Sequence, residues 1–158
     1  MKTPSFRFKI FTWFFIHFKV PMIGYTRPKI IELNDERLVA KIPLNRRTKN
    51  HLHSMYFGTL AVGADLAGGL HGFYHADKSN EKVSLAFKSF QAQFLKRPES
   101  DVYFVSGEGQ AVADMIKQSK TEQTRINRPI SIEAFTHYET TPELVATFTL
   151  ELSIKVIS

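Results

Sequence analysis

One segment limits the possible folds more than any other: a polar loop, Asn50–Gly58, runs directly into a stretch of small residues, Thr59–Gly72. Short side chains recur along it at steps of three and four, which places them on one smooth helix face: Gly58, Ala61, Ala64, Asp65, Gly68, Gly69 and Gly72. Each glycine inside a helix costs up to about 1 kcal/mol relative to alanine, so such a helix needs packing around it. We therefore expect a central helix over about Tyr56 to Tyr74, with Asp65 as its carboxylate.

Most of the chain around this helix is predicted to form β-strands, because apolar and polar residues alternate along it. The final strand, about Leu144 to Ile157, alternates strictly, and the strand after the helix changes phase near Lys88-Ser89, which predicts a β-bulge. Strands are expected at 29–33, 37–44, 83–94, 101–106, 125–138 and 144–157, with a short charged helix at 108–120. The later connections are too short for crossover helices, so we expect one antiparallel sheet packed against the central helix.

The composition fits a single globular domain, residues 1–158, with 43% hydrophobic residues, enough for a real core. The absence of cysteine excludes disulfides, thiol catalysis and cysteine-based zinc sites. A formal net charge of +6 favours anionic partners, although a charge of this size is also common on soluble domains.

The N-terminal segment, residues 1–24, is expected to form an amphipathic helix that ends where Pro21 and Gly24 break it, ahead of a core over residues 25–158. Its apolar run, Ile10–Ile16, is too short to span a membrane, and no signal-peptide cleavage site follows it, so we expect a cytoplasmic protein. The helix packs over the domain or at a dimer seam in one interpretation. In the other it makes peripheral contact with a membrane through its aromatic and basic residues.

The pattern resembles the hotdog fold, in which an antiparallel sheet of about six strands wraps around a long central helix, here with an extra N-terminal helix. The loop and helix are similar to those of phenylacetate-pathway acyl-CoA thioesterases, which carry an Asn, then His-Gly-Gly, then an acidic residue on the central helix. Asn50 stands at the Asn position, Tyr56-Phe57-Gly58 replaces His-Gly-Gly, and Asp65 stands at the acidic position. The chain is accordingly identified as an α+β protein of a thioesterase-like branch of that superfamily.

This resemblance implies an acyl-CoA, or acyl-carrier, thioester hydrolase. The N-terminus of the helix would act as an oxyanion hole, with Gly58 leaving room for the thioester carbonyl. Asp65 would be the general base or the nucleophile, and Asn50 would orient water or the thioester. Tyr56, Phe57 and His51 are then expected to bind substrate.

Three further expectations concern the substrate and the assembly. Ser84, on the strand after the helix, is a candidate for adding a hydroxyl to the pocket, and basic pairs such as Lys96-Arg97 are candidates for contact with coenzyme A phosphates. Hotdog domains pair so that each site draws on both chains, so a homodimer or a dimer of dimers is expected. The long final strand is consistent with such a paired edge.

Two alternatives remain open at this stage. A hotdog dehydratase acting on 3-hydroxyacyl thioesters would use His51 as base and Asp65 as acid. A non-catalytic module would bind acyl chains or lipid without turning them over. No cofactor, metal or nucleic-acid partner is expected, because the histidine pairs have no convincing third ligand and the strands carry no aromatic ladder between basic residues.

Overall fold

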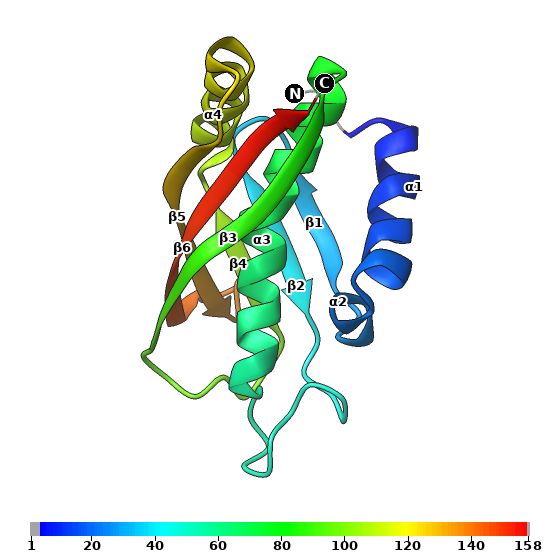
Figure 1. The fold of residues 1–158 in the computed structure, drawn as a ribbon. Helices are drawn as coiled ribbons and strands as arrows, with labels where there is room; N and C mark the ends of the chain where they lie inside the picture. Colours follow the sequence, from blue (N-terminus) through cyan, green and yellow to red (C-terminus); the bar gives the residue numbers. More distant parts are fainter. Residues whose placement is uncertain (1–3, 158) are drawn as a thin grey trace.

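A 23-residue helix, α3 (Phe57–Ser79), runs through the middle of the computed structural model, which describes residues 4–157 (Figure 1). It lies against a six-stranded sheet whose strand order is β1-β2-β4-β5-β6-β3, with every neighbouring pair antiparallel. The strands are β1 (Lys29–Leu33), β2 (Leu38–Ile42), β3 (Lys82–Phe94), β4 (Val102–Ser106), β5 (Ile126–Thr136) and β6 (Glu143–Ile157). The expected α+β architecture with six strands around a central helix is confirmed.

The glycines of α3 allow side chains of the sheet to approach the helix backbone closely. A Cβ atom at Gly63 would lie 2.2 Å from the ring of Phe104, and one at Gly72 would lie 2.4 Å from a methyl group of Leu85. Since real atoms never approach so closely, larger residues at these positions would force the sheet and the helix apart. The helix extends to Ser79, beyond the predicted end at Tyr74, and closes on Asn80 in the left-handed conformation.

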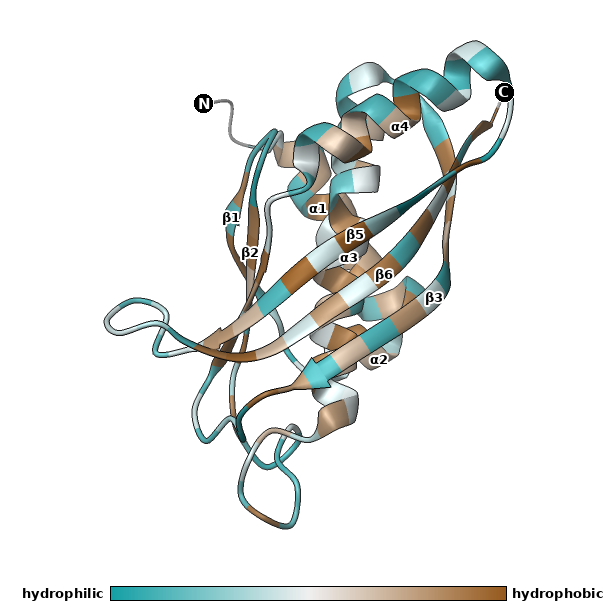
Figure 2. Cartoon of the chain, turned by 90° about the vertical axis from the view of Figure 1, so that its left-hand side faces the viewer, coloured by the Kyte–Doolittle hydropathy of each residue, from teal (hydrophilic) through white to brown (hydrophobic). Residues whose placement is uncertain are grey.

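The core lies between α3 and the inward face of the sheet. Alternate residues of β6 are fully buried there, including Phe148, Leu150, Leu152 and Ile154, and Figure 2 shows the alternation of hydrophobic and hydrophilic residues along β5 and β6. The bulge predicted near Lys88-Ser89 is confirmed, because the pairing of β3 with β6 shifts register between Phe87 and Phe90.

The position of β6 corrects one expectation. The final strand does not form an edge of the sheet, because β5 and β3 flank it on either side. The edge strands are β1 and β3. Since pairing depends on contacts distant in sequence, alternation alone could not identify which strand is left at the edge.

Two helical regions complete the fold. Helix α4 (Gly109–Glu122) packs one apolar side, Val112, Met115 and Ile116, against the sheet and α3. The N-terminal segment forms α1 (Phe6–Phe14), a π-helical turn η1 (Phe15–Lys19) and a short helix α2 (Pro21–Tyr25). It covers α3 on the side away from β6 (Figure 1).

The predicted break at Pro21 and Gly24 is only partly right. The chain turns at Val20, but Pro21 begins α2, where a missing N–H costs nothing, and Gly24 lies inside that helix. A Cβ at Gly24 would lie 2.7 Å from the carbonyl oxygen of Ile16, so glycine is needed for the two turns to pack.

Candidate active site

Asp65 lies halfway along α3 beside a cavity of about 330 Å³. Its carboxylate is half-buried, and it is the one charged side chain on a lining that is otherwise apolar: Phe15, Val20, Ile23, Leu66, Gly69, Leu70, Phe73, Leu85, Ala86 and Phe87. The lining comes from three parts of the chain, namely the N-terminal segment, α3 and β3. Such a cavity accommodates hydrocarbon with a single polar group beside it.

The carboxylate of Asp65 has an unusual electrostatic setting. Among residues 4–157, no hydrogen bond or salt bridge engages it, and burial raises its pKa above the usual value for aspartate. A carboxylate with a raised pKa is a stronger base, and one without a partner is free to accept a proton from water. The setting therefore suits proton transfer better than a structural role.

The N-terminus of α3 carries free backbone donors. Tyr56 is the N-cap residue, and its side chain makes no capping hydrogen bond. No hydrogen bond within the described part of the chain uses the N–H groups of Phe57 and Gly58, while the N–H of Thr59 donates to the carbonyl of Tyr56 at 2.9 Å. Two free donors at the positive end of a helix dipole are the kind of groups that a carbonyl oxygen gaining negative charge would need.

The loop before α3 borders a second cavity of about 510 Å³, at the N-terminal end of the helix. Its lining includes Asn50, His51, Tyr56, Phe57 and, from the far end of β3 and the turn after it, Phe94, Lys96 and Arg97. The side-chain oxygen of Asn50 accepts hydrogen bonds from the N–H of Leu52 at 2.8 Å and from Ser54 at 3.2 Å. Asn50 thus holds the loop in shape, and in residues 4–157 no hydrogen bond uses its amide nitrogen.

The structure brings some of the predicted site residues together and leaves others apart. Asn50, His51, Tyr56 and Phe57 share the loop cavity, whereas Asp65 lines the other one. Gly58 and Asp65 are seven residues apart, which places them on the same side of the helix but about 10 Å apart along its axis. Within one chain, therefore, a single thioester group cannot contact both.

Ser84 lies in neither cavity. Its hydroxyl accepts a hydrogen bond from the guanidinium of Arg125 at 3.0 Å, so it is engaged in a cross-strand contact. His51 lies in an exposed loop and does not share a cavity with Asp65, so the pairing that a dehydratase needs is not assembled within one chain. The catalytic and binding roles of all these residues remain predictions.

The sequence reasoning missed one wall of the Asp65 cavity, which Phe15, Val20 and Ile23 provide from η1 and α2. A clue was present, because a helix with so many small residues has to be covered on more than one side. For metals, the described residues contain no group of three or more His, Asp or Glu side chains that could hold an ion.

Comparison with known proteins defines the fold. The structure superimposes on a Pseudomonas aeruginosa protein of unknown function named as a probable thioesterase, with a TM-score of 0.77, 15% identity and coverage of 94% of this chain and 96% of the other. It is similar to a Chlorobaculum tepidum protein of unknown function, with a TM-score of 0.81, 14% identity and coverage of 97% and 96%. A thioesterase from Haemophilus influenzae matches with a TM-score of 0.60, 16% identity and coverage of 85% and 82%.

These matches establish that the chain has the hotdog fold, as the sequence resemblance implied, and that its structural neighbours include thioesterases. No protein-family model and no curated protein sequence matches the chain. At identities of 14 to 16% the likeness concerns the fold, so the chemistry has to be argued from the site itself.

Proposed function

We propose that this protein hydrolyses acyl thioesters. The observation that carries the proposal is the state of Asp65: a half-buried carboxylate with a raised pKa and no partner among residues 4–157, at the side of an apolar cavity. The uncapped start of the same helix adds two free N–H donors. Thioester hydrolysis needs both features, a base for water and donors for the oxyanion.

The chemistry follows from these two features. The free N–H groups of Phe57 and Gly58 would bind the thioester carbonyl oxygen and stabilise the negative charge that develops on it. Asp65 would take a proton from the attacking water, or would itself attack the carbonyl carbon, and both routes end in the free acid and the thiol. The apolar lining around Asp65 favours an aliphatic or other hydrocarbon acyl group over a charged one.

The carrier half of the substrate would lie toward the loop. Lys96 and Arg97 line the cavity there and provide positive charge for the phosphates of coenzyme A or of a carrier-protein prosthetic group. Their carboxylate neighbours, Glu143 and Glu99, are exposed, so solvent weakens these ion pairs and a phosphate could compete for the cations.

The separation of the two features along α3 supports a homodimer, as the family resemblance implies. If two copies pair with their α3 helices antiparallel, Asp65 of each copy can approach the N-terminus of α3 in the other. The edge strand β3 offers unpaired backbone groups for such pairing, and its Phe90 and Phe94 side chains are exposed. Light scattering should give the mass of a dimer or of a dimer of dimers.

Activity toward a series of acyl-CoA substrates of increasing chain length tests the proposal. Asp65→Asn should lower kcat/KM by about 100-fold or more, because it removes the base and keeps the shape of the side chain. Asp77→Asn, the same change on an exposed aspartate of the same helix, is the matched control and should leave the rate within about twofold.

Folding controls separate loss of chemistry from loss of structure. Burial disfavours the charge of Asp65, so Asp65→Asn should unfold at a urea concentration equal to or slightly above that of the native protein. If native protein and Asp65→Asn hydrolyse every substrate equally slowly, and both bind acyl-CoA, the protein is an acyl-binding module and the hydrolase proposal is wrong.

A further inference from the structure

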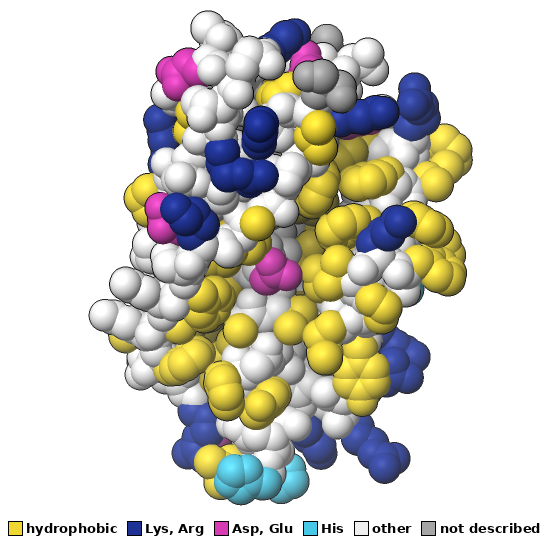
Figure 3. Space-filling view, in the orientation of Figure 1, with side chains coloured by type: hydrophobic (Ala, Val, Ile, Leu, Met, Phe, Trp, Pro, Cys, Tyr) yellow, Lys and Arg dark blue, Asp and Glu magenta, His cyan; other side chains and the backbone are white. Residues whose placement is uncertain are grey.

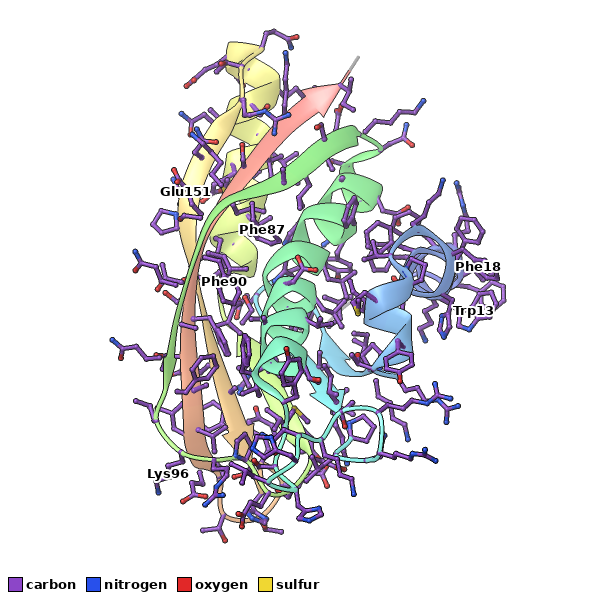
Figure 4. The ribbon with its side chains drawn as sticks, turned by 60° about the horizontal axis from the view of Figure 1, so that its bottom comes forward. Trp13, Phe18, Phe87, Phe90, Lys96 and Glu151 are labelled. Carbon is purple, nitrogen blue, oxygen red and sulfur yellow. The ribbon has the colours of Figure 1, made fainter. Side chains whose placement is uncertain are left out.

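The outer surface of the N-terminal segment carries a cluster of exposed apolar side chains. Phe6, Ile10, Trp13, Phe14, Phe18 and Met22 are all exposed, and the exposed fractions of Trp13 and Phe18 are 56% and 61%. We call these six residues the outer aromatic face. Figure 3 shows yellow hydrophobic side chains gathered over this part of the molecule with blue Lys and Arg side chains among them, and in Figure 4 Trp13 and Phe18 lie at its outer side, away from α3.

The same segment has a second, buried face, so it is held on the domain and is not a loose tail. Phe8 packs edge-on against Tyr74 with ring centroids 5.6 Å apart, and Phe15 lies 4.9 Å from Phe73. Rings of the outer aromatic face also contact their neighbours, because Phe14 stacks on Phe18 at 5.3 Å and Trp13 stacks on the imidazole of His17 at 5.0 Å. The segment therefore packs one face against α3 and presents the aromatic rings of the other face to the outside.

Charge singles out this part of the chain. The first 31 residues contain six Lys and Arg residues and no Asp or Glu, whereas the remaining residues contain 15 of each sign. Four of these six basic residues, and thus four of the six net positive charges, precede the end of α2 at Tyr25 and belong to the segment that carries the outer aromatic face. Arg7 and Lys9 flank that face on α1 and Lys19 follows it, and no salt bridge within residues 4–157 neutralises any of these three side chains.

We infer that the outer aromatic face docks on an anionic lipid bilayer, with α1, η1 and α2 lying in the plane of the interface. Aromatic and aliphatic side chains enter the region between head groups and acyl chains, while flanking Lys and Arg residues bind anionic head groups. The attachment is peripheral. In the part of the chain that the structure describes, no helix is long and apolar enough to cross a membrane.

The charge pattern favours a bilayer over a second copy of the chain on this face. Two such surfaces brought together would oppose positive charge to positive charge without any acidic side chain from the segment to compensate it. Docking would also bring the Asp65 cavity close to lipid, since Phe15, Val20 and Ile23 of the same segment form its wall.

Trp13 provides a direct test, because it is the only tryptophan of the chain. Its emission should shift to shorter wavelength when the native protein meets vesicles of phosphatidylcholine and phosphatidylglycerol in equal parts, and the protein should sediment with them. Vesicles of phosphatidylcholine alone should bind at least about tenfold more weakly, and high salt should release the protein.

Variants locate the surface. Phe14→Ser/Phe18→Ser should lower vesicle binding about tenfold or more and keep Trp13 as the reporter, whereas Leu52→Ser, at an exposed loop residue, should not. Lys9→Glu/Lys19→Glu should weaken binding, and Lys82→Glu/Lys155→Glu, which changes the net charge equally on β3 and β6, should have a smaller effect.

Three results would overturn the inference: no spectral shift and no sedimentation with anionic vesicles, a shift that follows protein concentration without lipid, or binding that single-stranded oligonucleotides abolish at low molar ratio. The second would identify the surface as an interface between copies of the chain, and the third as a nucleic-acid site. None of these outcomes depends on thioester hydrolysis.

Discussion

The two halves of α3 differ in whether their polar groups have hydrogen-bond partners. In the second half, the Nε2–H of His71 donates to the carbonyl of Asn34 at 3.2 Å, that of His75 donates to the carbonyl of Asp35 at 3.1 Å, and the hydroxyl of Tyr74 donates to the carboxylate of Asp35 at 3.0 Å. Lys78 completes the cluster through a salt bridge to the same carboxylate. In the first half, Asp65 and the N–H groups of Phe57 and Gly58 have no partner within residues 4–157.

This difference assigns a stabilising role to the second half of α3 and a chemical role to the first half. The second half attaches the turn between β1 and β2 to the helix through three hydrogen bonds and a salt bridge, and such paired polar groups hold a fold in one arrangement. The Nδ1 of His71 is the exception among them, a buried atom without a hydrogen-bond partner in the described residues. The first half keeps unsatisfied donors and a carboxylate disfavoured by burial, which lowers stability but leaves groups ready to bind and react. Changes in the first half should therefore affect activity, and changes in the second half should affect folding.

The largest expected effect tests the free donors of the first turn. Phe57→Pro removes one free N–H at the first helical position, where proline is well tolerated, and Tyr56 already has the extended conformation (φ −64°, ψ 137°) that a residue before proline prefers. We expect kcat/KM for an acyl-CoA to fall by about 100-fold or more, the usual cost of losing one oxyanion donor.

Phe57→Ala is the matched control, because it removes the ring and keeps the N–H. Its kcat/KM should fall by no more than about tenfold. Equal losses of kcat/KM in the two variants would show that the ring, and not the N–H donor, matters. Mixing refolded Phe57→Pro and Asp65→Asn chains should restore up to about a quarter of the native rate if each site is shared by two copies. No recovery would place the whole site within one chain.

The next effect concerns His71, which burial keeps neutral. Its Nδ1 is buried and has no hydrogen-bond partner in the described structure, and burial lowers its pKa to about 4, with a smaller effect from His75. An unfolded histidine takes up a proton near pH 6.5, so the unfolded state binds more protons between about pH 6.5 and pH 4. The free energy of unfolding should therefore decrease as the pH falls through that window, by up to about 3 kcal/mol.

Urea unfolding at pH 7 and at pH 4.5 measures this change. His71→Gln should flatten the dependence, and His17→Gln, at an exposed histidine of η1, should leave it as in the native protein. Burial also lowers the pKa of His75, so His71→Gln should retain a smaller slope of the same sign. A native protein equally stable at both pH values would contradict the assignment.

The smallest expected effect concerns the hydrogen bond between Tyr74 of α3 and the turn that joins β1 and β2. Tyr74→Phe removes the hydroxyl that donates to Asp35 and should lower the free energy of unfolding by about 1 kcal/mol, while kcat/KM stays within about twofold. Tyr25→Phe changes an exposed tyrosine and should have no effect on either quantity. A Tyr74→Phe variant of native stability but reduced activity would contradict the assignment of stability to the second half of α3 and of activity to the first.

Much of the fold could be predicted because it depends on local patterns. The strict alternation of β6, the phase change that marks the bulge near Phe87 and the small-residue stripe of α3 each follow from the geometry of one element. Which strand forms an edge could not be predicted in this way, and β6 proved to be internal. Pairing partners are chosen by the packing of the whole sheet.

The site was predicted less completely for the same reason. The spacing of Phe57 and Asp65 follows from the helix alone, but their positions in two different cavities do not. The wall that Phe15 contributes beside Asp65 comes from a segment 50 residues earlier in the chain. The periodicity of the N-terminal segment and that of α3 do not predict that these two segments contact each other.

The types of element, the central place of the glycine-rich helix and the carboxylate of Asp65 on it could all be read from the sequence, because periodicity and residue size act within a few turns of the chain. Packing of the whole chain leaves Asp65 and the N–H groups of Phe57 and Gly58 without partners in residues 4–157. It gives partners to the Nε2 of His71, to Tyr74, to His75 and to Lys78. Whether a polar group is satisfied depends on which distant segment is folded against it, and that is settled only when the whole chain has packed.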